Sequence, residues 1–138
     1  MSYPNPRSIQ DADLIKTIAL TAADGSVTTA DFDLGPNTKD HFPEGHILEI
    51  YLPIIGATEL ASADTLIALV QHGDTAAPTT AFSPSLTFTT TGTGSEIAAQ
   101  TVRFKLPYNV NRYVNVKFTS AGTSGDMSDK TATVKLLT

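Results

Sequence analysis

The sequence of 138 residues contains neither cysteine nor tryptophan. The absence of cysteine excludes disulfide bonds, thiolate metal sites and a cysteine nucleophile. The absence of tryptophan removes the largest aromatic side chain on which a sugar ring could stack. No apolar run reaches the length of a membrane span, and residues 1–7 lack the apolar core of a secretory signal. We therefore expect a protein that is made in a cytoplasm, has no membrane partner and is stabilised by packing, with or without oligomerisation.

Positive charge is also scarce, and it is unevenly placed. The formal net charge is −5, which argues against nucleic acid as a partner because phosphates attract a basic surface. Residues 46–99 contain no Lys or Arg, whereas residues 100–138 are rich in both. Two interpretations stay open at this point. Either these segments pair with acidic ones across neighbouring strands, or the protein has one polarised docking face.

The sequence does contain a series of short segments in which apolar and polar residues alternate. Such alternation places apolar side chains on one face of a strand and polar side chains on the other. In one of them Val102 and Phe104 face inward, whereas Arg103 and Lys105 face outward. Eight segments have strand character: 16–20, 28–34, 47–52, 65–71, 86–90, 101–106, 112–118 and 131–137. The fold class that we expect is all-β, a jelly roll or β-sandwich of about eight antiparallel strands.

The length suits one domain, and we expect residues 13–138 to form it. Residues 1–12 are polar and contain two prolines, which predicts an extended N-terminal arm. The segment 35–45 contains two prolines and two glycines and must be a loop.

Two local predictions concern how particular segments fold. Asp24-Gly25 is a tight-turn signal, so the segments 16–20 and 28–34 are expected to form a hairpin. In the second of these strands, Ala30 shares the inward face with Phe32 and Leu34. A short helix over residues 58–70 is the alternative to the strand at 65–71, because Ala and Leu favour helices.

Two carboxylate pairs, Asp11-x-Asp13 and Asp31-x-Asp33, are the first candidates for chemistry. Calcium requires six or more oxygens that converge on one point, and neither pair lies in a loop that supplies them. Asp31 and Asp33 fall on the outward face of a predicted strand, where solvated carboxylates are common. A glycosidase-like pairing depends on a distance in space that the sequence does not contain. We therefore predict no metal site at these residues.

The histidines and the glycine-rich segment are the other candidates. None of the three histidines has HxH or HExxH spacing, and no G-x-S-x-G elbow is present. His41 and His46 flank a loop and could share a ligand, but surface histidines without a function are the simpler interpretation; His72 begins the next long loop. Residues 91–94 lack the Lys that a phosphate loop needs. We therefore predict no catalytic residue, no cofactor and no enzymatic activity.

Exposed aromatic and basic residues indicate an interface instead. Tyrosine on a wet sheet face suits protein contacts because it buries a large area at low entropic cost. Arg103 and Lys105 on one predicted strand and Arg112 and Tyr113 on the next are expected to share the outward side of two adjacent strands. The predicted interface residues are Tyr51, Arg103, Lys105, Arg112 and Tyr113.

Four segments, in order, resemble the cement (decoration) proteins of tailed-phage capsids. The corner formed by Leu106-Pro107 and Arg112-Tyr113-Val114 is the most specific of them. The others are Asp31-Phe32-Asp33-Leu34-Gly35; residues 66–71 with Gly73-Asp74 and Phe82-Ser83; and Gly122-Thr123 before the final strand 131–136. The resemblance covers about residues 14–137.

The resemblance implies a jelly roll that binds the outside of a phage head as a homodimer or homotrimer. It implies the major capsid protein as partner, the virion exterior as location and no catalytic residues. The acidic, proline-bearing loop 35–45 departs from the family pattern, which leaves contacts there undefined.

Two other function classes remain open. The first is a carbohydrate-binding jelly-roll module of a phage fibre or surface protein, favoured by the fold class and the polar, histidine-bearing loops but opposed by the lack of tryptophan. The second is a small cupin-like or lipase-like hydrolase, which the missing metal-ligand and nucleophile-elbow spacings disfavour.

Overall fold

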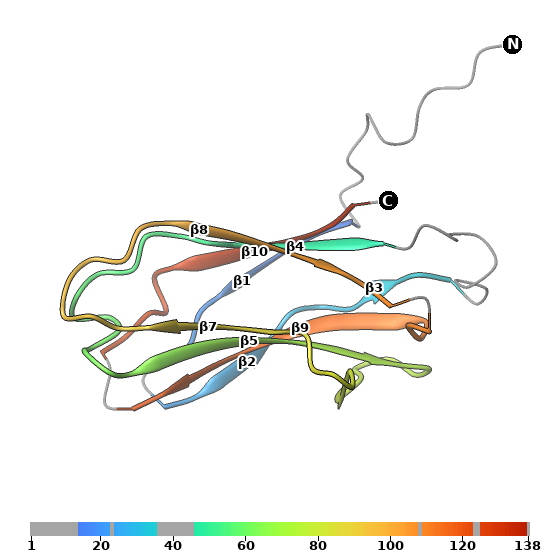
Figure 1. The fold of residues 1–138 in the computed structure, drawn as a ribbon, viewed down its shortest axis with the longest axis horizontal. Coiled ribbons are helices and arrows are strands. Elements are labelled where there is room, and N and C mark those ends of the chain that lie inside the picture. The colour runs from blue at the N-terminus through green and yellow to red at the C-terminus, as the bar shows by residue number, and fades with distance from the viewer. Residues whose placement is uncertain (1–13, 23, 36–45, 108, 123–124, 138) are drawn as a thin grey trace, which may run out of the picture.

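The computed structural model describes residues 14–22, 24–35, 46–107, 109–122 and 125–137. These residues form two antiparallel sheets that face each other, so the predicted all-β sandwich is confirmed (Figure 1). No helix within these ranges is both long enough and apolar enough to cross a bilayer. The predicted arm at residues 1–12 and most of the predicted loop at 35–45 lie outside the described residues.

The first sheet, sheet A, has four strands. In spatial order it contains β1 (Ile15–Ala19), β10 (Thr131–Leu137), β4 (Ile47–Leu52) and β8 (Gln100–Lys105).

The second sheet, sheet B, is built around two nine-residue strands that pair along their whole length. These are β5 (Thr65–Gly73) and β9 (Tyr113–Ala121). Two short strands share the free edge of β9, and two share the free edge of β5. They are β2 (Ser26–Thr28) and β3 (Phe32–Asp33) on β9, and β6 (Thr80–Ala81) and β7 (Thr87–Thr91) on β5.

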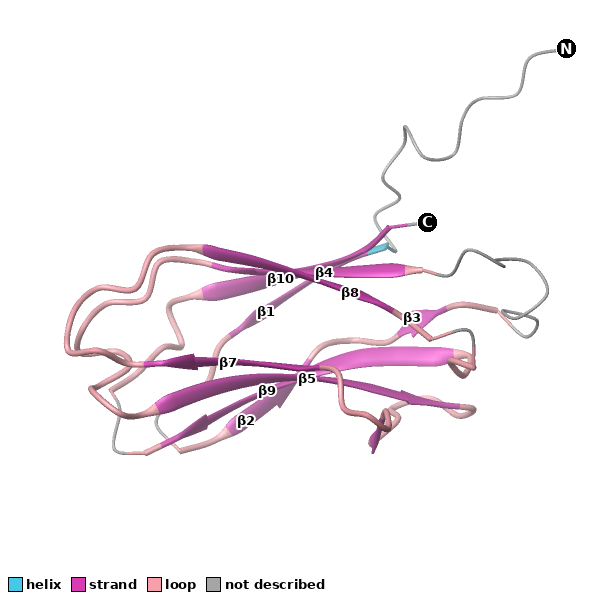
Figure 2. Ribbon diagram, in the orientation of Figure 1, coloured by secondary structure: helices cyan, strands magenta, loops and turns pink. Residues whose placement is uncertain are grey.

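The chain crosses between the sheets after β1, β3, β4, β7, β8 and β9. Strands that pair are therefore mostly remote in sequence, as in jelly rolls and Greek-key sandwiches. Figure 2 shows the crossings after β4 and β7 as loops at one end of the sandwich.

The predicted hairpin of segments 16–20 and 28–34 is wrong. β1 pairs with β10 in sheet A, whereas β2 pairs with β9 in sheet B. Asp24 does adopt the left-handed backbone of a tight turn, with φ 53°, but Gly25 then accepts a hydrogen bond from the Ser120 N–H (2.8 Å) rather than one from a hairpin partner. A turn signal determines the local bend of the chain, but it does not determine whether the two strands that flank the turn pair with each other.

The segment 28–34 is also interrupted, because β2 and β3 are separated by residues 29–31. The Thr29 N–H donates to the Val116 carbonyl (3.0 Å), and the Thr29 hydroxyl oxygen accepts from the Val116 N–H (3.1 Å). Thr29 is consequently buried and Ala30 exposed. The inward placement of Ala30 was wrong, whereas that of Phe32 and Leu34 is confirmed.

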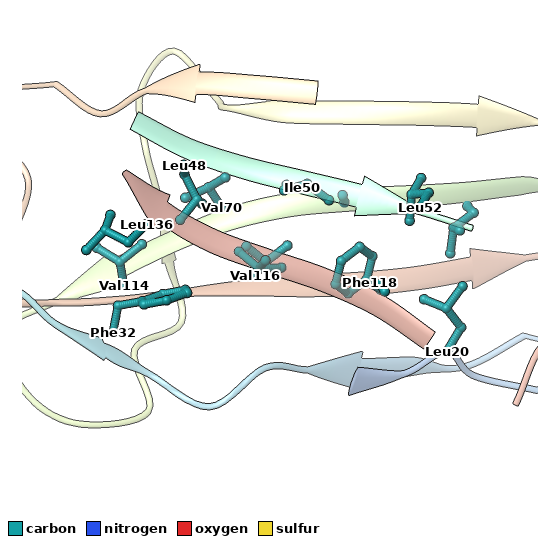
Figure 3. Packing of buried hydrophobic residues seen from close by; sticks show 14 of the residues in the cluster. Leu20, Phe32, Leu48, Ile50, Leu52, Val70, Val114, Val116, Phe118 and Leu136 are labelled. Carbon is teal, nitrogen blue, oxygen red and sulfur yellow. The ribbon is translucent and has the colours of Figure 1, made fainter. Parts of the chain in front are cut away.

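The strand predicted at 65–71 is confirmed as β5, and the alternative helix over 58–70 is absent. The predicted faces of β4 are also correct, since Leu48, Ile50 and Leu52 are buried and Tyr51 is exposed. These β4 side chains pack against Val116 and Phe118 of β9 across the space between the sheets (Figure 3). Burial of each large apolar side chain contributes about 1.5–3 kcal/mol.

Candidate functional site

The outer face of sheet A carries two of the three large hydrophobic side chains that are exposed among the described residues. Ile47 and Tyr51 of β4 are each 40% exposed, and Ile54, just after β4, is 47% exposed. No described element lies over this side of sheet A (Figure 1). Two large hydrophobic residues on one strand of an uncovered sheet, with a third exposed just after that strand, indicate a contact surface more strongly than a single exposed residue would.

Charged side chains flank these residues on the neighbouring strands. Glu49 lies between Lys135 of β10 and Arg103 of β8, and Arg103 Nε is 2.8 Å from Glu49 Oε2. Lys105 lies opposite Ile47. This face therefore has three basic residues and one acid, the opposite sign to the chain as a whole. We call it the sheet A face, defined by Ile47, Glu49, Tyr51, Arg103, Lys105 and Lys135.

Three of the five predicted interface residues, Tyr51, Arg103 and Lys105, lie together on the sheet A face. The expectation that they adjoin Arg112 and Tyr113 is wrong, because β8 belongs to sheet A and β9 to sheet B. The connection between β8 and β9 crosses the sandwich, so strands consecutive in sequence are not neighbours in space.

Arg112 and Tyr113 instead help to build one corner of sheet B. Arg112 donates from Nε and Nη2 to the two carboxylate oxygens of Asp33 (2.8 and 3.0 Å). Its guanidinium also lies 5.1 Å from the centre of the Tyr113 ring. The Arg112 hydrogen bond, helped by the Gly35 N–H, lowers the pKa of Asp33 to about 2. Among the described residues, Arg112 and Tyr113 therefore stabilise the fold by joining the end of β3 to the start of β9.

The two described histidines, His46 and His72, have different surroundings. His46 was expected in a surface loop, but it is only 2% exposed, and burial lowers its pKa. His72 was expected to begin a loop, but it lies within β5. Its ring stacks on the Phe82 ring with centroids 3.8 Å apart, and its Nδ1 accepts a hydrogen bond from the Asn111 N–H. His41 lies outside the described residues.

The carboxylates show no cation site either. Across the described ranges, no three His, Asp or Glu side chains are grouped to hold a metal ion. Asp31 accepts hydrogen bonds from the Ala77 N–H and from Asn115 Nδ2, so its oxygens support a loop. Asp11 and Asp13 lie outside the described residues.

A polar hollow of about 540 Å³ lies on the outer face of sheet B, opposite the sheet A face. Strands β2, β5 and β9 form its floor, and the segment between β5 and β6 forms one wall. It is lined by Ser26, Thr28, Thr29, Gln71, Ala77, Pro78, Thr79, Asn115 and Lys117.

Sequence reasoning missed this hollow. Asn115 points outward from β9, in register with Gln71, but it is only 1% exposed because the wall covers it. The available signal was an amide in each of two apolar segments, Gln71 and Asn115. Only the register, which sets these two residues opposite each other, joins them into one site.

No family model and no curated protein matches the chain. Among solved structures, it is similar to the sugar-binding C-terminal domain of EclA, with 8% identity over 99% of this chain and 82% of that one and a TM-score of 0.39. It is also similar to a CBM4 structure, with 10% identity over 88% of this chain, a TM-score of 0.33 and a span of about half (55%) of that chain. Neither similarity is strong enough to support a functional argument.

Proposed function

We propose that this chain is a non-catalytic binding protein that docks on the outside of a tailed-phage head and staples neighbouring major capsid subunits. The sheet A face is the observation that carries the proposal. It combines exposed Ile47 and Tyr51 with basic residues, and no described element covers it. The resemblance of four sequence segments to capsid cement proteins supports the same role.

The chemistry of the face suits a protein partner. Aromatic residues and Arg are enriched in protein interfaces, and Lys is depleted from their centres. Here Tyr51 lies near the middle of the sheet and Lys105 lies on the edge strand β8, as an apolar centre with a charged rim requires. The excess of basic residues would be complementary to an acidic partner surface.

The segments that resemble cement proteins help to build the fold rather than the proposed contact with the capsid. Asp33 and Arg112, from two of these segments, are joined by their paired hydrogen bonds, and Phe32 lies opposite Val114. These contacts are explained by the fold of the corner and do not require a partner. The proposed contact therefore rests on the sheet A face and not on the residues that carry the resemblance.

The proposed assembly is a homodimer or homotrimer on the capsid exterior, made in the host cytoplasm. Many copies, each with a modest interface, would reinforce a shell through avidity. An oligomer would also cover the exposed edge strands that a sandwich leaves open.

The test is cosedimentation of the purified protein with heads of the parent phage that have been stripped of accessory proteins. Wild type is expected to saturate the shell at a fixed ratio. Tyr51→Ala and Lys105→Glu, both at exposed side chains on the sheet A face, are expected to weaken binding roughly tenfold or more, because central aromatic and complementary charged residues dominate interface energies.

Lys117→Glu is the matched control, since it reverses a charge on the opposite sheet and is expected to bind normally. Circular dichroism checks that each variant is folded. If the wild-type protein does not cosediment with the stripped shells, the proposal is abandoned. If the Lys117 variant alone loses binding, docking uses sheet B and the sheet A face is the wrong surface.

A carbohydrate-binding module is a second candidate function. The observation that favours it is the polar hollow on sheet B, whose amide and hydroxyl side chains match the hydroxyl groups of sugars. The absence of tryptophan means that any sugar would be held by hydrogen bonds rather than by a large stacking platform. A glycan array without a single bound saccharide would remove this candidate.

A further inference from the structure

The last strand of sheet A, β8, has a free edge. The Leu106 N–H donates to the His46 carbonyl (2.8 Å), and bonded and non-bonded pairs alternate along an antiparallel ladder. By the register with β4, Thr101, Arg103 and Lys105 therefore direct their backbone N–H and C=O groups away from β4. These groups have no hydrogen-bond partner among the described residues. Such a row of unpaired backbone groups can pair with a further strand.

The two edges of sheet A differ in their protection against such pairing. At β1, Lys16 points inward, and an inward charge at an edge discourages a further strand. At β8, the inward side chains of Val102 and Phe104 carry no charge, and the strand contains no proline. Both are only half-buried, although Ile50 and Leu48 opposite them are fully buried. An added strand at β8 would therefore remove more apolar surface from water.

The outward side chains of β8 restrict which strand can pair there. Arg103 and Lys105 are exposed, and Lys105 forms no ion pair with another described residue. Arg103 uses Nε for Glu49, and its side chain is 66% exposed, so its two terminal nitrogens can reach a second carboxylate. Two β8 strands paired with each other would bring four basic side chains together, and like charges on opposite strands are destabilising. The edge therefore favours a strand with acidic residues at alternate positions.

The chain contains two pairs of acidic residues at alternate positions, Asp11-x-Asp13 and Asp31-x-Asp33. The second pair is already engaged within the fold. Asp31 accepts hydrogen bonds from the Ala77 N–H and from Asn115 Nδ2, and Asp33 is bound by an arginine of β9's corner. The first pair, which lies outside the described residues, is the one whose charges match the β8 edge.

The spacing of this first pair fits the spacing of the basic residues. An antiparallel register that sets Asp13 opposite Arg103 also sets Asp11 opposite Lys105, because residues two apart on each strand face the same side. Each carboxylate then lies across from one basic side chain on the outward face. Cross-strand pairs of opposite charge stabilise a sheet.

The distance across sheet A shows which copy of the chain supplies this strand. One row across the sheet contains Ile15, Lys135, Glu49 and Arg103. A strand added beyond β8 lies four strand spacings, or about 19 Å, from Ile15 in that row. Asp13 precedes Ile15 by two residues, which span at most about 7 Å. The acidic segment that pairs with β8 must therefore belong to another copy.

We propose that residues 10–13 of one copy pair with β8 of a second copy and extend its sheet A, with Asp11 opposite Lys105 and Asp13 opposite Arg103. The inference rests on the homo-oligomer of the proposed function and names the contact that forms it. The segment and the edge are different surfaces, so every edge is filled either by reciprocal exchange in a dimer or by a closed ring of three copies.

The first test detects this contact between copies directly. Because the chain lacks cysteine, Gln10→Cys provides a single site for a nitroxide spin label. The labelled protein is mixed with ¹⁵N-labelled wild type, and the same mixture with the nitroxide reduced is the reference. We expect the nitroxide to broaden the amide signals of residues 101–105. No broadening between copies, or broadening confined to other residues, would overturn the inference.

The second test exchanges the charges of one pair and measures association by sedimentation velocity at a series of concentrations. Asp11→Lys is expected to raise the dissociation constant of the oligomer roughly fivefold or more, because it opposes Lys105 with a like charge. Adding Lys105→Glu to the same chain restores opposite charges and is expected to restore association. Asp74→Lys is the matched control, since it makes the same charge change at an exposed residue far along the chain, and it is expected to associate like wild type.

Failure of this inference can be distinguished from failure of shell docking, because Asp11→Lys leaves the sheet A face unchanged. An oligomer that Asp11→Lys does not weaken shows that another surface joins the copies, and it overturns the inference. A wild-type protein that is monomeric at every concentration also overturns it, while cosedimentation with stripped shells still tests docking. If the copies associate as expected but do not cosediment with shells, docking alone fails.

Discussion

The direction of the Asp33 side chain was predicted correctly from the sequence, but its hydrogen-bond partners were not. It was predicted to be an outward-facing, solvated carboxylate, and it is exposed as expected. It nevertheless accepts hydrogen bonds from Arg112, 79 positions away, and from the Gly35 N–H (2.9 Å). Alternation along a strand predicts the direction of a side chain, whereas its partner depends on which strand lies beside it.

This pair predicts a pH-dependent contribution to stability. The pKa of Asp33 is about 2 in the folded protein against 3.8 in the unfolded chain. The stabilisation is therefore complete above about pH 4 and is lost as the pH falls from about 4 to about 2. Asp33→Asn is expected to lower the free energy of unfolding at pH 7 by at most about 1 kcal/mol, because the pair is solvent-exposed. Urea denaturation at a series of pH values measures it.

Glu96→Gln serves as the control, because Glu96 is exposed and forms no ion pair with a described residue. It is expected to unfold like wild type at every pH. The role assigned to the Asp33–Arg112 pair is wrong if the deficit of the Asp33 variant persists unchanged at pH 2.

At the scale of elements, the crossings between sheets impose close contacts that no local pattern contains. Gly92 follows β7 and packs against the segment before β5: its N–H donates to the Asp64 carbonyl (2.8 Å), and its carbonyl accepts from the Ala63 N–H (3.0 Å). A Cβ at this position would collide with the carbonyl oxygens of Leu60 and Ala61. The glycine is thus required by packing between backbones, although the sequence marked it only as part of a glycine-rich segment.

Gly92→Ala is therefore expected to destabilise the protein by several kcal/mol or to prevent folding, because backbone must move to admit the methyl group. Gly94→Ala is the matched control. Gly94 has φ +80° but open space around it, so the cost is limited to about 1–2 kcal/mol of backbone strain. Thermal unfolding followed by circular dichroism compares the two. Equal losses in the two variants would contradict the close contact assigned to Gly92.

The edge of sheet A shows a second effect at this scale. Lys16 of β1 lies opposite buried Val134, so it points toward the interior of the sandwich, and its Nζ lies 5.7 Å from the centre of the Phe32 ring. A charge that points inward at an edge strand discourages pairing with another chain. The sequence placed this residue in a strand but did not show that the strand is an edge.

At the scale of the whole molecule, stability depends on the contact between the two sheets. Phe118 is fully buried at the centre of β9 and belongs to the same apolar cluster as Ile50 and Leu52 of the other sheet (Figure 3). No disulfide is available to compensate for a loss in this cluster. Packing between the sheets must therefore hold the sandwich together.

Phe118→Ala is expected to lower the free energy of unfolding by about 3–5 kcal/mol, because it removes a large buried side chain and leaves a cavity. Urea denaturation at 25 °C measures the change from the shift in midpoint at constant m-value. Tyr51→Ala on the exposed outer face is the control and is expected to change stability by less than about 0.5 kcal/mol. Comparable losses in both variants would contradict the assigned core.

The sequence by itself determined the fold class, the positions of most strands and the face that most side chains occupy. These properties follow from the alternation of apolar and polar residues within each short segment, as β4 and β8 show. Only the tertiary structure decided that β1 pairs with β10, that Arg112 belongs to a different sheet from Arg103, and that Gln71 lies opposite Asn115. Pairing and register depend on contacts between segments far apart in the chain, and a local pattern carries no information about which segments meet. For the same reason the sheet A face was partly anticipated from sequence, whereas the hollow on sheet B came only from the structure.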